Sequence, residues 1–201
     1  MTDEIMQKCI EACHSAHNVP HINNKQEIKW IWPETFHHLF PGQMNDHFHT
    51  NEFPERKALA LCNHCDNPPC VRVCPTKATF KRPDGIVMMD FHRCVGCRYC
   101  MAACPYGSRS FNFADPRKYL KESERTLEFP TRTKGVVEKC LFCYERLAEG
   151  KQPYCVEVSE GTIYFGDLND PHSDVRKVLK ERYAIRRKPE LGTSPCVYYL
   201  I

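Results

Sequence analysis

The sequence contains no long apolar segment and little glycine. No hydrophobic run approaches the roughly 18 residues that a helix needs to cross a bilayer, and the mean hydropathy is -0.54. Glycine accounts for only 9 of the 201 residues, whereas proline accounts for 15. These absences exclude an integral membrane protein. A composition of 42% hydrophobic and 26% charged residues predicts one compact domain or two small units.

Catalytic motifs are absent as well. The chain has no glycine-rich phosphate loop, no HExxH metalloprotease motif and no GxSxG nucleophile elbow. The ligand patterns described below account for nearly every thiol and leave few for nucleophilic chemistry. We therefore expect a protein that makes and breaks no substrate bonds itself and is not an enzyme.

Cysteine is abundant, and its spacing decides the class of protein. Fourteen of the 201 residues are cysteine, which indicates a disulfide framework, structural zinc or iron–sulfur clusters. Cys9, Cys13 and Cys196 lie apart from the rest. The others form three short groups: Cys62, Cys65, Cys70 and Cys74; Cys94, Cys97, Cys100 and Cys104; and Cys140, Cys143 and Cys155.

The first two groups share one pattern. Residues 94–105 read CVGCRYCMAACP, the CxxCxxCxxxCP run of bacterial two-cluster ferredoxins. Residues 62–75 read CNHCDNPPCVRVCP, the same run with two residues inserted before its third cysteine. Four cysteines within 11 residues would crowd a tetrahedral zinc site, and a secreted disulfide scaffold would not repeat the run. The pattern predicts [4Fe–4S] clusters, with a zinc-ribbon interaction module as the alternative.

The spacing also predicts which cysteines share a cluster. A tight CxxCxxC loop wraps three corners of a four-iron cube, and its backbone N–H groups point towards the cluster sulfides. The last cysteine of each run lies one helical turn further on and faces the other cluster, and the proline after it ends the helix. The expected ligand sets are Cys62, Cys65, Cys70 and Cys104 for one cluster, and Cys94, Cys97, Cys100 and Cys74 for the other.

The segment between the two runs predicts a hairpin. Residues 78–90 read ATFKRPDGIVMMD, with two β-favouring runs around a Pro-Asp-Gly turn. Ligand loops and hairpin together indicate an α+β ferredoxin-like unit over residues 59–115. Further along, Ser173 is expected to cap a short helix.

The third group begins as CxxC, in CLFCYERLAEGKQPYC, but Ser159 occupies the position of its expected fourth cysteine. Here the chain resembles the polyferredoxin subunits of molybdoenzyme-type respiratory complexes, over almost its whole length. The resemblance is sharpest for the branch linked to dissimilatory sulfite reductase. The segments that carry it are CIEACHSAHNVP, IKWIWPE, YFGDLNDP and ELGTSPCVYYL.

The resemblance implies a second ferredoxin-like unit, made of residues 1–58 and 116–201 with long loops, that is degenerate. In the family, a cysteine group at the start of the chain, which corresponds to Cys9 and Cys13 here, pairs with the group that corresponds to Cys140, Cys143 and Cys155. The resemblance therefore implies a third ligand set of Cys140, Cys143, Cys155 and Cys13. The partner site of that set would need Cys9 and three further cysteines, but Met6 and Ser159 occupy two of those positions. We therefore expect three [4Fe–4S] clusters, with Cys9 and Cys196 unused.

The resemblance also implies function and partners. It predicts an electron-transfer subunit that passes single electrons along the clusters, beside a quinone-interacting integral membrane subunit and a multihaem cytochrome c. By resemblance, the expected location is the outer, periplasmic face of the cytoplasmic membrane. A cytoplasmic location is the alternative, because the first 30 residues show no apolar signal core and no twin arginine. A subunit of a molybdoenzyme or hydrogenase complex is the alternative within this class.

The positive charge of the chain does not predict nucleic-acid binding. The formal net charge is +3, but each oxidised cluster with four thiolates carries about −2, so three clusters bring the protein to about −3. Basic residues near the ligands are expected to offset the cluster charge: Arg72, Lys77, Arg93, Arg98, Arg109, Lys139 and Arg146. Among the histidines, His64 and His92 are candidates to tune a neighbouring cluster.

Two segments without cluster ligands have open interpretations. Residues 19–58 are rich in aromatic side chains, including Trp30, Trp32, Phe36, Phe40, Phe48 and Phe53. They either cover the clusters against water or form a docking surface. The C-terminal segment ELGTSPCVYYLI either contacts another subunit or packs on its own domain.

Overall fold

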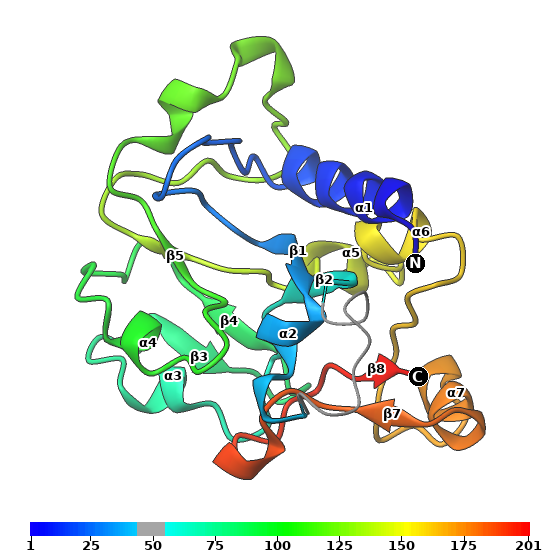
Figure 1. The fold of residues 1–201 in the computed structure, drawn as a ribbon. Helices are drawn as coiled ribbons and strands as arrows, with labels where there is room; N and C mark the ends of the chain where they lie inside the picture. Colours follow the sequence, from blue (N-terminus) through cyan, green and yellow to red (C-terminus); the bar gives the residue numbers. More distant parts are fainter. Residues whose placement is uncertain (44–54) are drawn as a thin grey trace.

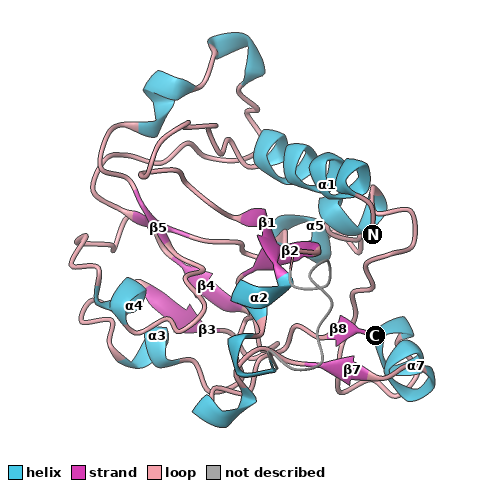
Figure 2. Cartoon of the chain, in the orientation of Figure 1, coloured by secondary structure: helices cyan, strands magenta, loops and turns pink. Residues whose placement is uncertain are grey.

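The computed structural model describes residues 1–43 and 55–201 and shows a mixed α+β fold. Most of the chain is loop, with short helices and small sheets between the loops (Figure 2). The longest described helix is α1 (Asp3–Ala16), which lies along one side of the molecule (Figure 1). Thr2 caps it by accepting the Ile5 N–H.

The described strands form small antiparallel pairs, and none of the pairs joins a larger sheet. The hairpin expected between the first two cysteine runs is confirmed, with Gly85 at φ 87° in its turn. The pairs are β1 (Ile31–Thr35) with β2 (Lys57–Leu61), β3 (Thr79–Lys81) with β4 (Val87–Met89), β5 (Ser110–Phe111) with β6 (Val137–Glu138), and β7 (Ala184–Ile185) with β8 (Tyr199–Leu200).

The remaining helices are short. Two follow the ligand loops and end just before Cys74 and Cys104, as the Cys-Pro pattern predicts. The helix expected after Ser173 is confirmed, although the Ser173 hydroxyl donates to upstream carbonyls instead of capping it. The α-helices are α2 (Phe36–Leu39), α3 (Pro69–Arg72), α4 (Tyr99–Ala102), α5 (Tyr144–Ala148), α6 (Tyr154–Glu157) and α7 (Asp174–Glu181); 3-10 turns span Pro41–Gln43, Pro116–Tyr119, Glu122–Glu124 and Pro189–Leu191.

One hydrophobic core connects the parts of the chain that hold cysteine. It joins buried residues of α1, the β3–β4 hairpin and β6, and many of the cysteines belong to it. Trp30, Trp32 and Phe40 are buried, so these aromatic residues serve packing, whereas Phe48 and Phe53 lie outside the described residues. The division of the chain into two ferredoxin-like units stays a prediction.

The C-terminal segment packs on its own chain. It returns through β8, which pairs with β7 (Figure 1). Before β8 it runs beside the first ligand loop, where the Asp66 N–H donates to the Ser194 carbonyl at 2.8 Å and the Cys196 N–H donates to the Asn63 carbonyl at 2.9 Å. Among the described residues, the helices are too short and too polar to span a bilayer.

Candidate iron–sulfur sites

Four cysteines from both runs line one cavity of ≈ 320 Å³. We call them the Cys62 set: Cys62, Cys65, Cys70 and Cys104. The first three are 8–9% exposed. Burial, followed by the neighbouring Cys62 thiol, raises the pKa of Cys65 to about 12. Such thiols become thiolates only when a cation compensates their charge, and the irons of a cluster supply that compensation.

Unpaired polar atoms in this cavity fit a cluster. Asn63 is 1% exposed, and neither its Oδ1 nor its Nδ2 has a hydrogen-bond partner among the described residues. Arg109 also lines the cavity, and its Nη2 has no such partner either. Buried polar groups without partners are costly, and the bridging sulfides of a cluster would accept hydrogen bonds from the Asn63 Nδ2 and Arg109 Nη2 N–H groups. The Cys62 set therefore suits a [4Fe–4S] cluster in both its thiols and its surroundings.

The second expected set also lines a single cavity, of ≈ 270 Å³. This Cys94 set consists of Cys74, Cys94, Cys97 and Cys100. Cys97 is exposed and Cys100 is buried, so the cavity lies at the surface. Burial raises the pKa of Cys74, but hydrogen bonds from the Thr79 N–H at 3.4 Å, the Thr76 hydroxyl and further backbone N–H groups lower it below its usual value. This is the inward-pointing backbone expected around cluster ligands.

The third set, the Cys140 set, consists of Cys13, Cys140, Cys143 and Cys155. Burial, followed by the charges of Cys140, Cys155 and Cys143, raises the pKa of Cys13 well above its usual value. The four thiols therefore lie close enough to act on one another. Cys13 comes from α1 and Cys155 from α6, and these two helices pack together. The structure thus gathers residues that lie more than 100 positions apart in the sequence.

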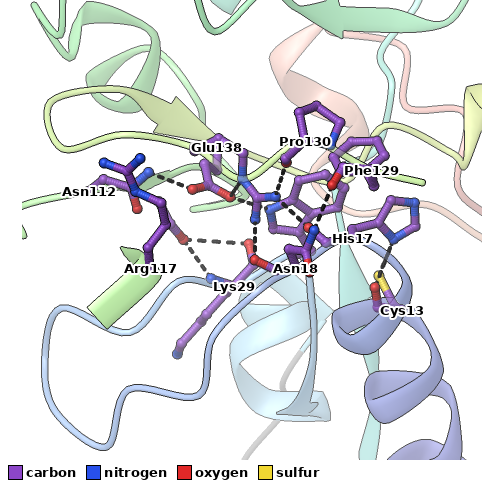
Figure 3. Close-up of polar contacts among 12 residues, drawn as sticks. Cys13, His17, Asn18, Lys29, Asn112, Arg117, Phe129, Pro130 and Glu138 are labelled. Carbon is purple, nitrogen blue, oxygen red and sulfur yellow. Dashed lines mark hydrogen bonds and ion pairs between the residues drawn. The ribbon is translucent and has the colours of Figure 1, made fainter. Parts of the chain in front are cut away.

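A buried ion pair holds the segments around the Cys140 set. Arg132 Nε donates to Glu138 at 2.7 Å, and both side chains are fully buried. The other nitrogens of Arg132 donate to the carbonyls of His17 and Asn18. Figure 3 labels the acceptor residues His17, Asn18 and Glu138. Trp30 Nε1 donates to the same carboxylate at 3.0 Å. These bonds tie the end of α1 to β6, next to two ligand positions.

His17 supports the same set from α1. Its Nδ1 lies 2.7 Å from the Cys13 carbonyl oxygen and its Nε2 lies 2.8 Å from the Glu145 carboxylate. Burial lowers its pKa, but hydrogen bonds to Cys143 and Glu145 raise it to about 9, so the ring is protonated and donates from both nitrogens. The donor atoms of His17, Cys143 and Glu145 lie within 4.8 Å of one another. Because Cys143 is an expected cluster ligand, this trio belongs to the Cys140 set.

The Cys62 set lies between the other two. Arg109 lines the cavity of the Cys62 set and donates to Thr79, which lines the cavity of the Cys94 set. His64, which also lines the cavity of the Cys62 set, lies against the Cys140 set: its Nδ1 accepts the Val87 N–H, so its Nε2 carries the proton that is donated to the Cys140 carbonyl at 3.1 Å. Burial lowers the pKa of His64 well below its usual value, so the ring is neutral. His92, the other histidine suggested to tune a cluster, is exposed.

The residues at the predicted degenerate fourth site are buried in the protein core. Cys9 is completely buried, and its thiol donates to the Cys155 carbonyl at 3.3 Å. Ser159 is also completely buried; its hydroxyl donates to the Val156 carbonyl at 2.7 Å and accepts the Ile163 N–H. Met6 packs in the same core. None of the fourteen cysteines, all of which lie among the described residues, forms a disulfide.

Sequence reasoning missed several residues around the sites. Asn63 was overlooked although it lies inside a ligand loop. His17 follows Cys13 by four positions on a helix, a spacing that places both on one face and could have revealed it. Arg132 and Glu138 lie only six positions apart, but their other partners, Asn18 and Trp30, come from a distant segment that local spacing does not reveal.

Comparison with known proteins identifies the family. Residues 57–118 match the model of the 4Fe-4S dicluster domain. The protein is 43% identical to the Hdr-like menaquinol oxidoreductase iron-sulfur subunit 1 of Archaeoglobus fulgidus, over 98% of its own length and 74% of that relative. It is 37% identical to the iron-sulfur cluster-binding subunit of menaquinone reductase from Nitratidesulfovibrio vulgaris (96% and 82%) and 34% identical to the B subunit of polysulfide reductase from Wolinella succinogenes (96% and 85%). It therefore belongs to the family of [4Fe–4S] electron-transfer subunits of molybdoenzyme-type oxidoreductase complexes.

Proposed function

We propose that this chain carries three [4Fe–4S] clusters, one in each cysteine set, and relays single electrons along them. The observation that carries the proposal is the gathering of twelve cysteines as three sets of four, with the Cys62 set in the middle. A bound cluster would supply one-electron redox chemistry without a change in bonding. The chain itself provides thiolate ligands, N–H donors and the exclusion of water.

The count of three is supported by the state of Cys9. A cysteine that donates its S–H to a carbonyl is a protonated structural thiol, whereas a cluster ligand must be a thiolate. Ser159 is satisfied by its own helix in the same way. Ordinary core packing thus occupies the place of a fourth site.

Iron content tests this count. Two variants are compared, with substitutions one turn apart on α1. Cys13→Ser removes a ligand of the Cys140 set, and Cys9→Ser removes a thiol outside every set. We expect about 12 irons per wild-type chain, about 8 in Cys13→Ser and no change in Cys9→Ser. About 16 irons in the wild type, or equal losses in the two variants, would contradict the proposal. Zinc without iron would favour the zinc-ribbon alternative.

We further propose that the chain works in a membrane-associated respiratory complex of dissimilatory sulfur metabolism, as the DsrO-type subunit. The segments that carry the sequence resemblance support this assignment, as do relatives named for menaquinol and menaquinone oxidoreduction. The proposed neighbours are a quinone-interacting integral membrane subunit and a multihaem cytochrome c, on the periplasmic face of the membrane.

Isolation of the native complex tests the partners. We expect gentle solubilisation of membranes to copurify the chain with a multihaem cytochrome c and a quinone-interacting subunit. Copurification with a molybdenum-containing or hydrogenase catalytic subunit would instead favour the alternative, because other relatives are named as subunits of dimethyl sulfoxide and tetrathionate reductases. Recovery from the cytoplasm without membranes would contradict the proposed location.

A further inference from the structure

The basic residues near the ligands differ sharply in burial. Arg72, Lys77 and Arg93 are exposed, whereas Arg109 is 5% exposed and Lys139 is completely buried. Water and salt screen the exposed charges, but a buried charge acts on its neighbours through a much lower effective dielectric constant. Among these basic residues next to the ligands, Arg109 and Lys139 therefore have the strongest influence on any charge held by the cysteine sets.

Arg109 lies between the Cys62 set and the Cys94 set. It lines the cavity of the Cys62 set. Its Nη1 donates to Thr79 Oγ1 at 3.1 Å and contacts Met89 Sδ, and both of these residues line the cavity of the Cys94 set. The charges of Cys70 and Cys100, one from each set, raise its pKa although burial opposes them. A guanidinium is always protonated in proteins, so its charge is permanent.

Lys139 lies between the Cys62 set and the Cys140 set. Its Nζ donates to the carbonyls of Val87 and Cys140, the second at 2.8 Å. Val87 lines the cavity of the Cys62 set, and Cys140 belongs to the other set. Burial, with a smaller contribution from the charge of Arg109, lowers the pKa of Lys139, and the charges of Cys62, Cys140 and Cys70 oppose this shift.

We propose that Arg109 and Lys139 make the cluster of the Cys62 set the most readily reduced of the three. The inference rests on the proposed three-cluster function. Reduction adds one electron and takes a cluster with its four thiolates from about −2 to about −3, with no bond formed or broken. The Cys62 set has a buried cation on both sides. Each outer set shares only one of these two. The two other buried cations near the Cys140 set, Arg132 and His17, are paired with the carboxylates of Glu138 and Glu145.

The test is an EPR-monitored redox titration of the purified protein with all clusters bound. Arg109→Gln keeps a hydrogen-bond donor but loses the charge, and Lys139→Met loses the ammonium group. We expect Arg109→Gln to lower the potentials of two clusters and Lys139→Met to lower a different pair, with the first-reduced cluster common to both. The expected shift is at least tenfold in the reduction equilibrium, which is 59 mV for one electron. Arg109→Lys should restore the potentials.

Control variants separate this effect from structural damage. Arg93→Gln removes an exposed charge beside the Cys94 set and should shift no potential by as much. A ligand exchange identifies the signal independently: Cys65→Ser should alter the first-reduced EPR signal, and Cys97→Ser and Cys143→Ser should not. If three clusters are present but Cys65→Ser leaves that signal unchanged, or Arg109→Gln moves no potential, the inference is wrong. If iron analysis finds fewer than three clusters, the proposed function fails first.

Discussion

The Cys94 set and the Cys140 set each contain four cysteines, but they differ in how far apart these cysteines lie in the sequence and in how deeply they are buried. Three ligands of the Cys94 set fall within seven consecutive residues, and one of them, Cys97, is exposed. The Cys140 set combines residues from α1, the loop after β6 and α6, and Cys13, Cys140 and Cys143 are buried. One set is thus built by a local motif at the surface, and the other by tertiary packing in the core.

This contrast shows which interactions stabilise each site. The loop of the Cys94 set is shaped by its own backbone, with Gly96 and Arg98 at positive φ. The Cys140 set depends on the ion pair of Arg132 with Glu138 and on the hydrogen bonds to the end of α1. We therefore expect core substitutions to disable the Cys140 set together with the fold, and loop substitutions to act on the Cys94 set alone.

The largest effect is expected from Arg132→Met. The change leaves the Glu138 carboxylate buried without its cation, which typically costs about 3–5 kcal/mol of unfolding free energy. It also releases the end of α1, which supplies Cys13. Denaturant unfolding should show the loss of stability, and iron analysis should show about four irons fewer per chain.

The surface counterpart is Arg93→Gln. Arg93 is paired with Asp90 at 3.2 Å but is 66% exposed, so its loss should change stability by no more than about 0.5 kcal/mol and leave the iron content intact. Comparable losses in the two variants would contradict the contrast between a packed site and a local one.

An intermediate effect is expected from Gly96→Ala in the loop of the Cys94 set. Gly96 has φ 71°, and an added Cβ would lie 2.3 Å from the Gly135 carbonyl oxygen. Alanine at this position would therefore have a backbone strain of about 1–2 kcal/mol and, in addition, a steric clash with the Gly135 carbonyl oxygen. We expect a loss of about 3 kcal/mol and altered EPR of that cluster only.

Gly150→Ala provides the matched control for backbone strain. Gly150 has φ 73°, but a Cβ there meets no atom within 4 Å. Its substitution should cost only about 1 kcal/mol, measured by the same denaturant curves. An equal cost at the two glycines would mean that the close approach to Gly135 has no energetic weight.

The local parts of the molecule could be predicted from its sequence. The hairpin follows from two β-favouring runs around Pro83, Asp84 and Gly85, and the two short helices follow from the Cys-Pro spacing. Each of these features is decided by residues a few positions apart, where spacing and propensity act directly. The members of the Cys62 and Cys94 sets were likewise predicted from the spacing of cysteines within the two runs.

The tertiary parts could not be read in this way. The sequence identified Arg109 and Lys139 only as basic residues near ligands, because burial is a property of the packed molecule. The Arg132–Glu138 pair is close in sequence, but its remaining partners come from residues 17 and 18. The C-terminal segment had two open interpretations, and only its hydrogen bonds to the first ligand loop select between them.

A smaller effect than that of Gly96→Ala is expected from Thr193→Val, which tests whether the C-terminal segment protects the Cys62 set. The Thr193 hydroxyl bonds to the Tyr106 hydroxyl at 2.5 Å, and its carbonyl accepts the Asn67 N–H at 3.1 Å. Removing the hydroxyl leaves the backbone contact, so we expect a loss of about 1 kcal/mol. The cluster beside Cys65 should also lose iron to a chelator faster, because Thr193 hydrogen-bonds to that thiol. Thr133→Val, at an exposed position, is the control; equal chelation rates in the two variants would show that the C-terminal segment does not protect the middle site.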